Sequence, residues 1–410
     1  MTRFITFFVA SPNAIDLDCN VPLVLEYAKT RKVLIVCSEI LSFENSLLNK
    51  FPVLEDNANV RIIYLDKIFS LRILINFGFK NRKLLKIFAK ISLLFNNLNN
   101  LKRICNNSDL IFATNLLQDR GKTVEEIFYK YSKESDAIFI GNQLVPWVSW
   151  YQSYLFDFDY FLCSSKDEYE ELKTKKLDVK IVFKGCPSFD INYLNLFGDK
   201  NSSLNNNIKS KTALFIMSNR KTPMYINHDV IYKEVKDFIR FLESHSYKCI
   251  MRLHPSSQVQ DKIEFNKIGI NNSYIIQDSI ETISSKIDIA ISFISTASLK
   301  CIAHKIPTVT YIPDSLIESF SSFDIDSQSK LFSGNEKIIN QFTNFYFKSK
   351  DFNKYRLEDF SHVIKKPEDI MKISESEQKK KHEIFLENFK PQNASANILE
   401  FFNTILKYEK

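Results

Sequence analysis

Glycine, proline and tryptophan are scarce in this sequence, and its cysteines are scattered. The 410 residues include 7 glycines and 11 prolines, which excludes collagen-like and low-complexity chains. The 7 cysteines show no C-x-x-C spacing, so neither a disulfide framework nor a zinc site is indicated. No run of about 18 apolar residues is present, and the first residues lack a signal-peptide pattern. We therefore expect a cytoplasmic protein without a membrane span.

The composition is that of a globular protein with a mild basic excess. Hydrophobic residues make up 45% of the chain, charged residues 25%, and phenylalanine alone accounts for 36 positions. The length suggests two domains, because a domain usually has roughly 100–200 residues. The formal net charge of +7 favours anionic partners such as nucleotides, phosphorylated glycans or a lipid surface. No concentrated stripe of basic and aromatic residues indicates nucleic acid.

Short apolar runs alternate with stretches of helical period, which is typical of parallel α/β domains. The expected strands of the first series are 4–10, 32–37, 60–65, 109–114, 137–141, 160–164 and 179–185. Those of the second series are 212–217, 248–253, 273–277, 287–293 and 308–311, followed by a largely helical, charged tail after about residue 335. The fold class predicted is α/β, with two Rossmann-like domains facing across a cleft.

The domain boundaries follow from a polar stretch that is nearly free of apolar residues. We place an N-terminal domain at 1–198, a linker at 199–211 and a C-terminal domain at 212–385. A final helix at 386–410 is expected to pack back on the N-terminal domain. Parallel sheets of this kind bind ligands at the carboxyl ends of their strands, so motifs at strand ends carry the most weight.

The sharpest local motif is Arg252-Leu253-His254-Pro255-Ser256, at the end of the expected strand 248–253. Pro255 removes a backbone donor and favours an extended conformation at His254, so the imidazole should project at the edge of the sheet. There it can donate to a phosphate oxygen, and Ser256 can add a hydroxyl donor or cap the next helix. The alternative is a strand-end turn followed by a capped helix.

A second motif follows the expected strand 287–293, where Ser295, Thr296 and Ser298 open a helix. Free amides and hydroxyls at a helix N-terminus can hold an anion. An ordinary Ser/Thr cap is the competing interpretation. A third element, Ser218-Asn219-Arg220, follows the first strand of the second domain and either contacts a phosphate or forms a solvated basic loop.

The order of these elements resembles the donor-binding half of the GT-B glycosyltransferases. More narrowly, His254-Pro255 and the later Ser/Thr motif are similar to bacterial sialyl-, polysialyl- and Kdo transferases that use CMP-sugars, and to CDP-glycerol or CDP-ribitol phosphotransferases. Residues 160–165 and 184–190 likewise resemble the stretch that closes the first domain in the capsule and polyol-phosphate branch. The resemblance covers residues 135–315.

This resemblance implies an inverting transfer that needs no metal or other cofactor. It implies that His254, Ser295 and Thr296 contact the nucleotide phosphate in the C-terminal, donor-binding domain, while the N-terminal domain holds the acceptor. One departure concerns the general base, because the acidic Asp/Glu-Asp/Glu-Gly motif of CMP-sialic acid transferases has no counterpart here. The nearest match is Gln118-Asp119-Arg120-Gly121.

The base must then come from another carboxylate of the first domain. Asp16 follows the first strand and is the first candidate, with Asp119 the second. Asp18 lies on the acceptor side, or else Asp18 or Asn20 caps the following helix. Gln143 ends another strand and either orients a sugar hydroxyl or satisfies a loop. The histidines show no ligand spacing, so we assign no metal site.

The segment 80–95 is basic and amphipathic, with Lys83, Lys86 and Lys90 on one helical face. Such a helix can lie on an anionic membrane and would suit an enzyme that extends a lipid-linked glycan. The alternative is a core-facing helix with a solvated lysine face, which is the more common arrangement.

Three functions compete. The preferred one is a transferase that moves a sugar from a CMP-sugar to a surface glycan such as capsule or lipooligosaccharide, with CDP-polyol phosphotransfer as its variant. The second is a UDP-sugar transferase or a UDP-N-acetylglucosamine 2-epimerase of the same fold, although the clustered acidic residues and the arginine- and histidine-rich first domain of those epimerases are not found. The third is an inert glycan-binding scaffold, which nucleotide binding would exclude.

Overall fold

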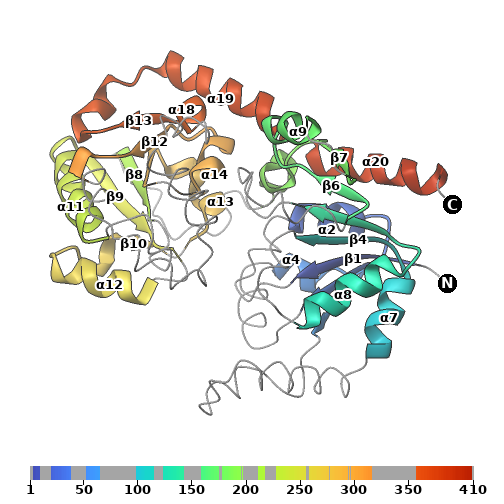
Figure 1. The fold of residues 1–410 in the computed structure, drawn as a ribbon. Helices are drawn as coiled ribbons and strands as arrows, with labels where there is room; N and C mark the ends of the chain where they lie inside the picture. The colour runs from blue at the N-terminus through green and yellow to red at the C-terminus, as the bar shows by residue number, and fades with distance from the viewer. Residues whose placement is uncertain are drawn as a thin grey trace, which may run out of the picture. The chain divides into compact units, whose positions relative to one another are not determined.

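A computed structural model of the chain describes residues 3–9, 20–37, 52–64, 98–114, 123–142, 158–174, 178–194, 196, 211–217, 228–254, 258–276, 278–293, 295, 297–315 and 357–408. The chain forms two compact units (Figure 1). Unit 1 comprises Met1–Asp190 with Asn388–Lys410, and unit 2 comprises Ile191–Glu387. Segment 80–95 lies outside the described residues. Among the described helices, none has the length and apolar character needed to cross a bilayer.

Unit 1 contains a parallel seven-stranded sheet in the order β3-β2-β1-β4-β5-β6-β7. Its strands are β1 (Phe4–Val9), β2 (Val33–Cys37), β3 (Val60–Tyr64), β4 (Ser108–Thr114), β5 (Ile138–Asn142), β6 (Tyr160–Leu162) and β7 (Lys180–Val182). Its helices are α2 (Val21–Ala28), α4 (Pro52–Glu55), α7 (Leu98–Asn106), α8 (Thr123–Lys133), α9 (Lys166–Lys173), η3 (Pro187–Phe189) and α20 (Ala394–Tyr408). The strand order reverses between β1 and β4, which is where sheets of this class bind ligands.

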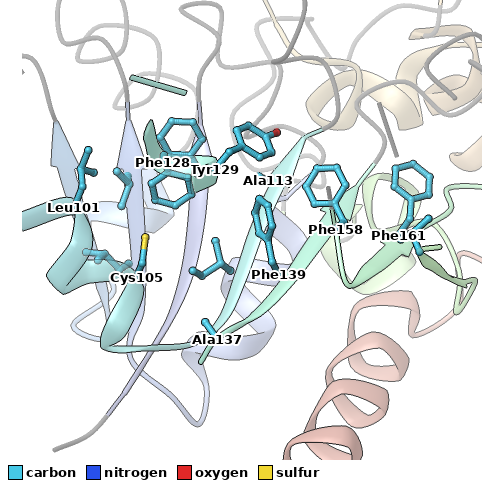
Figure 2. Close-up of a cluster of buried hydrophobic side chains, with 14 of the residues drawn as sticks. Leu101, Cys105, Ala113, Phe128, Tyr129, Ala137, Phe139, Phe158 and Phe161 are labelled. Atoms are coloured by element: carbon cyan, nitrogen blue, oxygen red, sulfur yellow. The ribbon is translucent and has the colours of Figure 1, made fainter. Parts of the chain in front are cut away.

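Strands β1, β2 and β5 of unit 1 are buried on both faces, as is typical of largely apolar parallel strands. Successive side chains of a strand point to opposite faces. Phe8 therefore stacks on Phe128 of α8, with ring centroids 4.1 Å apart, while the neighbouring Phe7 meets Tyr27 of α2 at 6.4 Å. Figure 2 shows the aromatic cluster on the first of these faces, which also includes Phe139 and Phe158.

Unit 2 contains a parallel six-stranded sheet in the order β10-β9-β8-β11-β12-β13, which reverses between β8 and β11. Its strands are β8 (Lys211–Ile216), β9 (Tyr247–Arg252), β10 (Ile275–Ile276), β11 (Ile289–Ser292), β12 (Thr308–Tyr311) and β13 (His362–Ile364). Its helices are α10 (Ile191–Leu194), α11 (His228–Ser244), α12 (Gln258–Lys267), η5 (Asn272–Tyr274), α13 (Ile280–Ile283), η6 (Ser284–Lys286), α14 (Ala297–Ala303), α18 (Leu357–Phe360), η9 (Pro367–Lys372) and most of α19 (Glu375–Phe389).

The C-terminal segment 388–395 is fixed to the loop 184–190 within unit 1. Cys186 N donates to Phe389 O at 2.8 Å, and the carboxylate of Asp190 accepts from Ser395 N at 2.7 Å, at the start of α20. Phe402 of α20 then packs edge-on against Phe112 at 5.7 Å. Loop 184–190, which resembles a stretch that closes the first domain in related transferases, thus has a structural role in holding α20.

Gly185 in this loop should tolerate no side chain. Its φ of +114° is unfavourable for other residues, and an added Cβ would lie 2.4 Å from Lys390 O. We expect Gly185→Ala to destabilise unit 1 by about 3 kcal/mol or more, measured by urea unfolding. Gly269→Ala is the matched control, because φ there is +83° but no atom lies within 4 Å of the added Cβ. That change should destabilise by only about 1–2 kcal/mol, and equal losses would contradict the close-contact argument.

Three histidines of unit 2 make its stability depend on pH. Burial lowers the pKa of His304, His362 and His382, and each Nε2 lies out of reach of solvent with no hydrogen-bond partner among the described groups. The unfolded chain therefore takes up these protons first, so stability is full above about pH 6.5 and falls as the pH drops below it. Urea unfolding of unit 2 between pH 8 and pH 5 checks this. His382→Asn should make the loss of stability at low pH smaller but not remove it, because His304 and His362 still contribute. A stability of unit 2 that does not change with pH in the unaltered protein would contradict the prediction.

Candidate functional site

Four of the site residues predicted from the sequence lie in the described part of the chain: Arg252, His254, Ser295 and Ser298. The other predicted site residues lie outside it: Asp16, Asp18, Asp119, Gln143, Ser218, Asn219, Arg220, Pro255, Ser256 and Thr296. The strands that precede Asp16 and Asp119 are β1 and β4, which are neighbours at the point where the sheet order of unit 1 reverses. The roles predicted for Asp16, Asp119 and the other residues outside the described part of the chain stay predictions.

Arg252 and Ser292 lie on one row at the carboxyl edge of the sheet of unit 2. Ile216, the last residue of β8, pairs with Arg252 on one side and with Ser292 on the other. Side chains in one row of a parallel sheet point to the same face, and Ile216 belongs to the core on the face of α13 and α14. Arg252 and Ser292 therefore point toward these helices, and His254 follows β9 two residues later at a half-buried position.

A buried carboxylate connects this row to the helices. Glu281 of α13 and Lys300 of α14 form an ion pair with 2.8 Å between Oε1 and Nζ, and their side chains are 9% and 17% exposed. Burial alone would favour the neutral acid, but Lys300 and Arg252 hold the pKa of Glu281 well below its usual range. One carboxylate thus interacts with two cations, Arg252 at the end of β9 and Lys300 of α14.

The serines that open α14 are engaged within the fold. Ser295 Oγ accepts from Ala297 N at 3.3 Å, and Ser298 Oγ donates to Ser295 O at 2.5 Å. Ser298 is 1% exposed. The geometry is that of a Ser/Thr turn at the start of a seven-residue helix. Ser295, which is half-buried, is the more accessible of the two hydroxyls.

Sequence patterns do not single out Glu281 and Lys300. The two are separated by 19 positions along the chain and belong to no short motif. The local signal at Glu281 is only that of a helix start, since Ser279 caps α13 by accepting from Thr282 N. Their connection depends on α13 and α14 packing side by side on the sheet, which periodicity does not reveal.

Thiol and metal chemistry find no support among the described residues. The six described cysteines are free and buried, and burial raises the pKa of Cys186 and of Cys301 to about 12. Within the same part of the chain, no group of three or more His, Cys, Asp or Glu side chains is placed to hold a metal ion.

The chain matches no protein-family model, and no curated protein matches it in sequence. Similar solved structures include a Listeria monocytogenes protein assigned as a UDP-N-acetylglucosamine 2-epimerase, with a TM-score of 0.59 and 12% identity over 100% of this chain and 98% of that chain. S. aureus MnaA, solved with UDP, has a TM-score of 0.54 and 14% identity over 99% of this chain and 97% of that chain. The wall teichoic acid polymerase TagF has a TM-score of 0.50 and 11% identity over 99% of this chain and 90% of that chain.

At sequence identities of 11–14%, the similarity to these solved structures shows the fold of the chain and not its activity. Each match spans nearly the whole chain, and each unit has the parallel sheet with a reversal of strand order that Rossmann-like domains have. The predicted class, two Rossmann-like α/β units of the GT-B type, is confirmed.

Proposed function

We propose that this protein is a glycosyltransferase that binds a nucleotide-activated sugar through unit 2 and transfers the sugar to a surface glycan. The observation that carries the proposal is the group formed by Arg252, Glu281 and Lys300 at the carboxyl edge of the sheet of unit 2. His254 follows Arg252 by two residues along the chain. Sheets of this class bind ligands at this edge, where the order of their strands reverses. Cations held there by a buried carboxylate suit a phosphate group.

In the proposed reaction an acceptor hydroxyl attacks the anomeric carbon of the donor sugar. The bond from that carbon to the phosphate oxygen breaks, and the nucleotide leaves with the electron pair. His254 donates a hydrogen bond to the leaving phosphate, and Arg252 and Lys300 offset its charge. A carboxylate of unit 1, Asp16 or else Asp119, takes the proton of the hydroxyl. Attack opposite the leaving group inverts the anomeric centre, and no metal or cofactor takes part.

The finer proposal is a cytidine donor, a CMP-sugar of the sialic acid or Kdo type. It is supported by the His254-Pro255 motif followed by Ser295-Thr296, with CDP-polyol phosphotransfer as the variant. A uridine donor is the second candidate, favoured by the likeness of the fold to MnaA, which was solved with UDP. The two candidates predict different leaving groups, CMP from the first and UDP from the second.

Nucleotide release tests the proposal. The purified chain is incubated with a CMP-sugar panel or a UDP-sugar panel and a bacterial glycan acceptor, and free nucleotides are separated by chromatography. Acceptor-dependent release of CMP or UDP, lost in His254→Ala, is the expected result. Conversion of UDP-N-acetylglucosamine at C2 without release of nucleotide would indicate an epimerase instead. If neither panel changes, the proposed activity is wrong.

A further inference from the structure

A hollow of about 500 Å³ lies in unit 1, along α20 and beside the end of β7, and it shares no residue with the sheet edge of unit 2. Its volume falls within the range of about 300–1,000 Å³ that small-ligand sites occupy. The residues that line it are Phe183, Lys184, Lys390, Asn397, Glu400, Phe401 and Thr404. The proposed transfer reaction uses none of them.

Two ammonium groups in this hollow are positioned by aromatic rings. Lys184 Nζ lies 5.0 Å from the ring centroid of Phe401, and Lys390 Nζ lies 5.7 Å from that of Phe183. Such contacts restrain long side chains that would otherwise sample many rotamers. Lys390 directly follows α19, and its φ of +41° is the left-handed conformation that often ends a helix. Both lysines are thus held at one small hollow.

Helix α20 contributes a row of polar side chains to the lining. Asn397, Glu400 and Thr404 recur at helical spacing, so they share one face, and all three are exposed. They supply an amide, a carboxylate and a hydroxyl, a set that can bind sugar hydroxyls as donors or acceptors. Lys184 and Lys390 add two positive charges to the lining, and the carboxylate of Glu400 offsets one of them.

We propose that this hollow binds an acidic sugar residue of the glycan acceptor, a subsite that rests on the proposed transferase function. The ligand's carboxylate or phosphate pairs with Lys184 and Lys390, while its ring hydroxyls meet the row of Asn397, Glu400 and Thr404. A concave site with a carboxylate in its wall suits one charged sugar better than it suits a flat anionic membrane. The subsite lies in unit 1, whereas the proposed nucleotide site lies in unit 2.

Direct binding of defined oligosaccharides to the full chain tests the subsite. The probes are tetragalacturonic acid and the neutral maltotetraose, which have the same number of hexose rings. Affinity is measured by calorimetry at low and at high salt, since salt screens exposed charge pairs. The double variant Lys184→Glu/Lys390→Glu reverses both charges. Lys407→Glu is the matched control, because Lys407 is an exposed lysine of α20 that does not line the hollow.

The subsite predicts binding of the acidic tetrasaccharide alone, weakened by salt. The double variant should lose at least about tenfold in affinity, and Lys407→Glu should change it by less than about twofold. Thr404→Trp, which fills the hollow without altering charge, should also abolish binding and covers the case that the double variant misfolds. Equal affinity for both sugars, or an unchanged affinity in Thr404→Trp, would overturn the subsite.

Two further readouts distinguish the subsite from a membrane contact and from the nucleotide site. Binding to vesicles of anionic phospholipid that is lost in the double variant, with no sugar binding, would replace the subsite with a membrane contact. Stabilisation of the chain by nucleotides should be the same in the double variant as in the unaltered protein. If the chain does not bind the acidic tetrasaccharide but is still stabilised by nucleotides, the subsite is refuted and the proposed function is not.

Discussion

Replacing His254 by alanine should lower the turnover of nucleotide-sugar transfer by about 10²–10³-fold while the protein stays folded. His254 lies two residues after Arg252, the last residue of β9, and a single hydrogen-bond donor to a departing phosphate is worth that much in the transition state. Because this interaction strengthens only as charge develops on the phosphate, kcat should fall more than KM rises. The measurement is steady-state release of the nucleotide from the donor.

His245→Ala is the control for this experiment, since that histidine is exposed after α11 and lies outside the motif at the strand end. It should leave turnover unchanged. Urea unfolding of His254→Ala should show no more than a small change in stability. Near-normal turnover in His254→Ala would remove the histidine from the mechanism, whereas loss of both folding and turnover would assign it a structural role.

Replacing Glu281 by glutamine should reduce the stability of unit 2 by about 3–5 kcal/mol. The change leaves the Lys300 ammonium, whose side chain is 17% exposed, without the carboxylate 2.8 Å away. It also removes the negative charge that interacts with Arg252. The double change Glu281→Gln/Lys300→Met should recover part of the loss, because the uncompensated cation is then gone. Urea unfolding of Glu281→Gln, Lys300→Met and the double variant gives a double-mutant cycle, which measures the interaction energy of the pair.

The exposed pair Asp314–Lys365 is a matched comparison within the same unit. Its N–O distance is 2.7 Å, but the side chains are 60% and 59% exposed. Asp314→Asn should therefore change stability by no more than about 1 kcal/mol. A similar small effect for Glu281→Gln would mean that the buried pair does not stabilise the edge of the sheet. Nucleotide affinity in Glu281→Gln, measured below the unfolding temperature, then shows whether the carboxylate also positions the cations for phosphate.

Periodicity was sufficient to predict most of the parallel strands. The expected strands 4–10 and 248–253 agree to within one residue with β1 and β9, because buried parallel strands are continuous apolar runs that local composition reveals. The prediction of a largely helical tail after residue 335 misses one strand. The tail contains α19 and α20 but also β13, a three-residue strand that includes a histidine and pairs with β12. Its pairing partner, not its composition, makes it a strand.

The sequence predicts only those residues of the candidate site that stand in short motifs, because contacts between separate helices leave no local pattern. His254 and Ser295 stand in short motifs at strand ends, so they could be selected. Glu281 and Lys300 become neighbours only through the packing of α13 and α14. Likewise, nothing in the composition of loop 184–190 indicates that Asp190 accepts a hydrogen bond from a backbone amide of a helix about two hundred residues later.

The most direct test of the central claim is thermal unfolding of the purified chain with CMP, CDP, UMP, UDP and GDP. A nucleotide at 100 times its dissociation constant should stabilise the folded state by about 2.7 kcal/mol. A nucleotide site in unit 2 predicts stabilisation by CMP or CDP, or by UDP if the donor is a uridine sugar, and loss of that stabilisation when Arg252 is replaced by alanine. An unfolding temperature that none of the five nucleotides raises would contradict such a site and favour a glycan-binding protein without transferase activity.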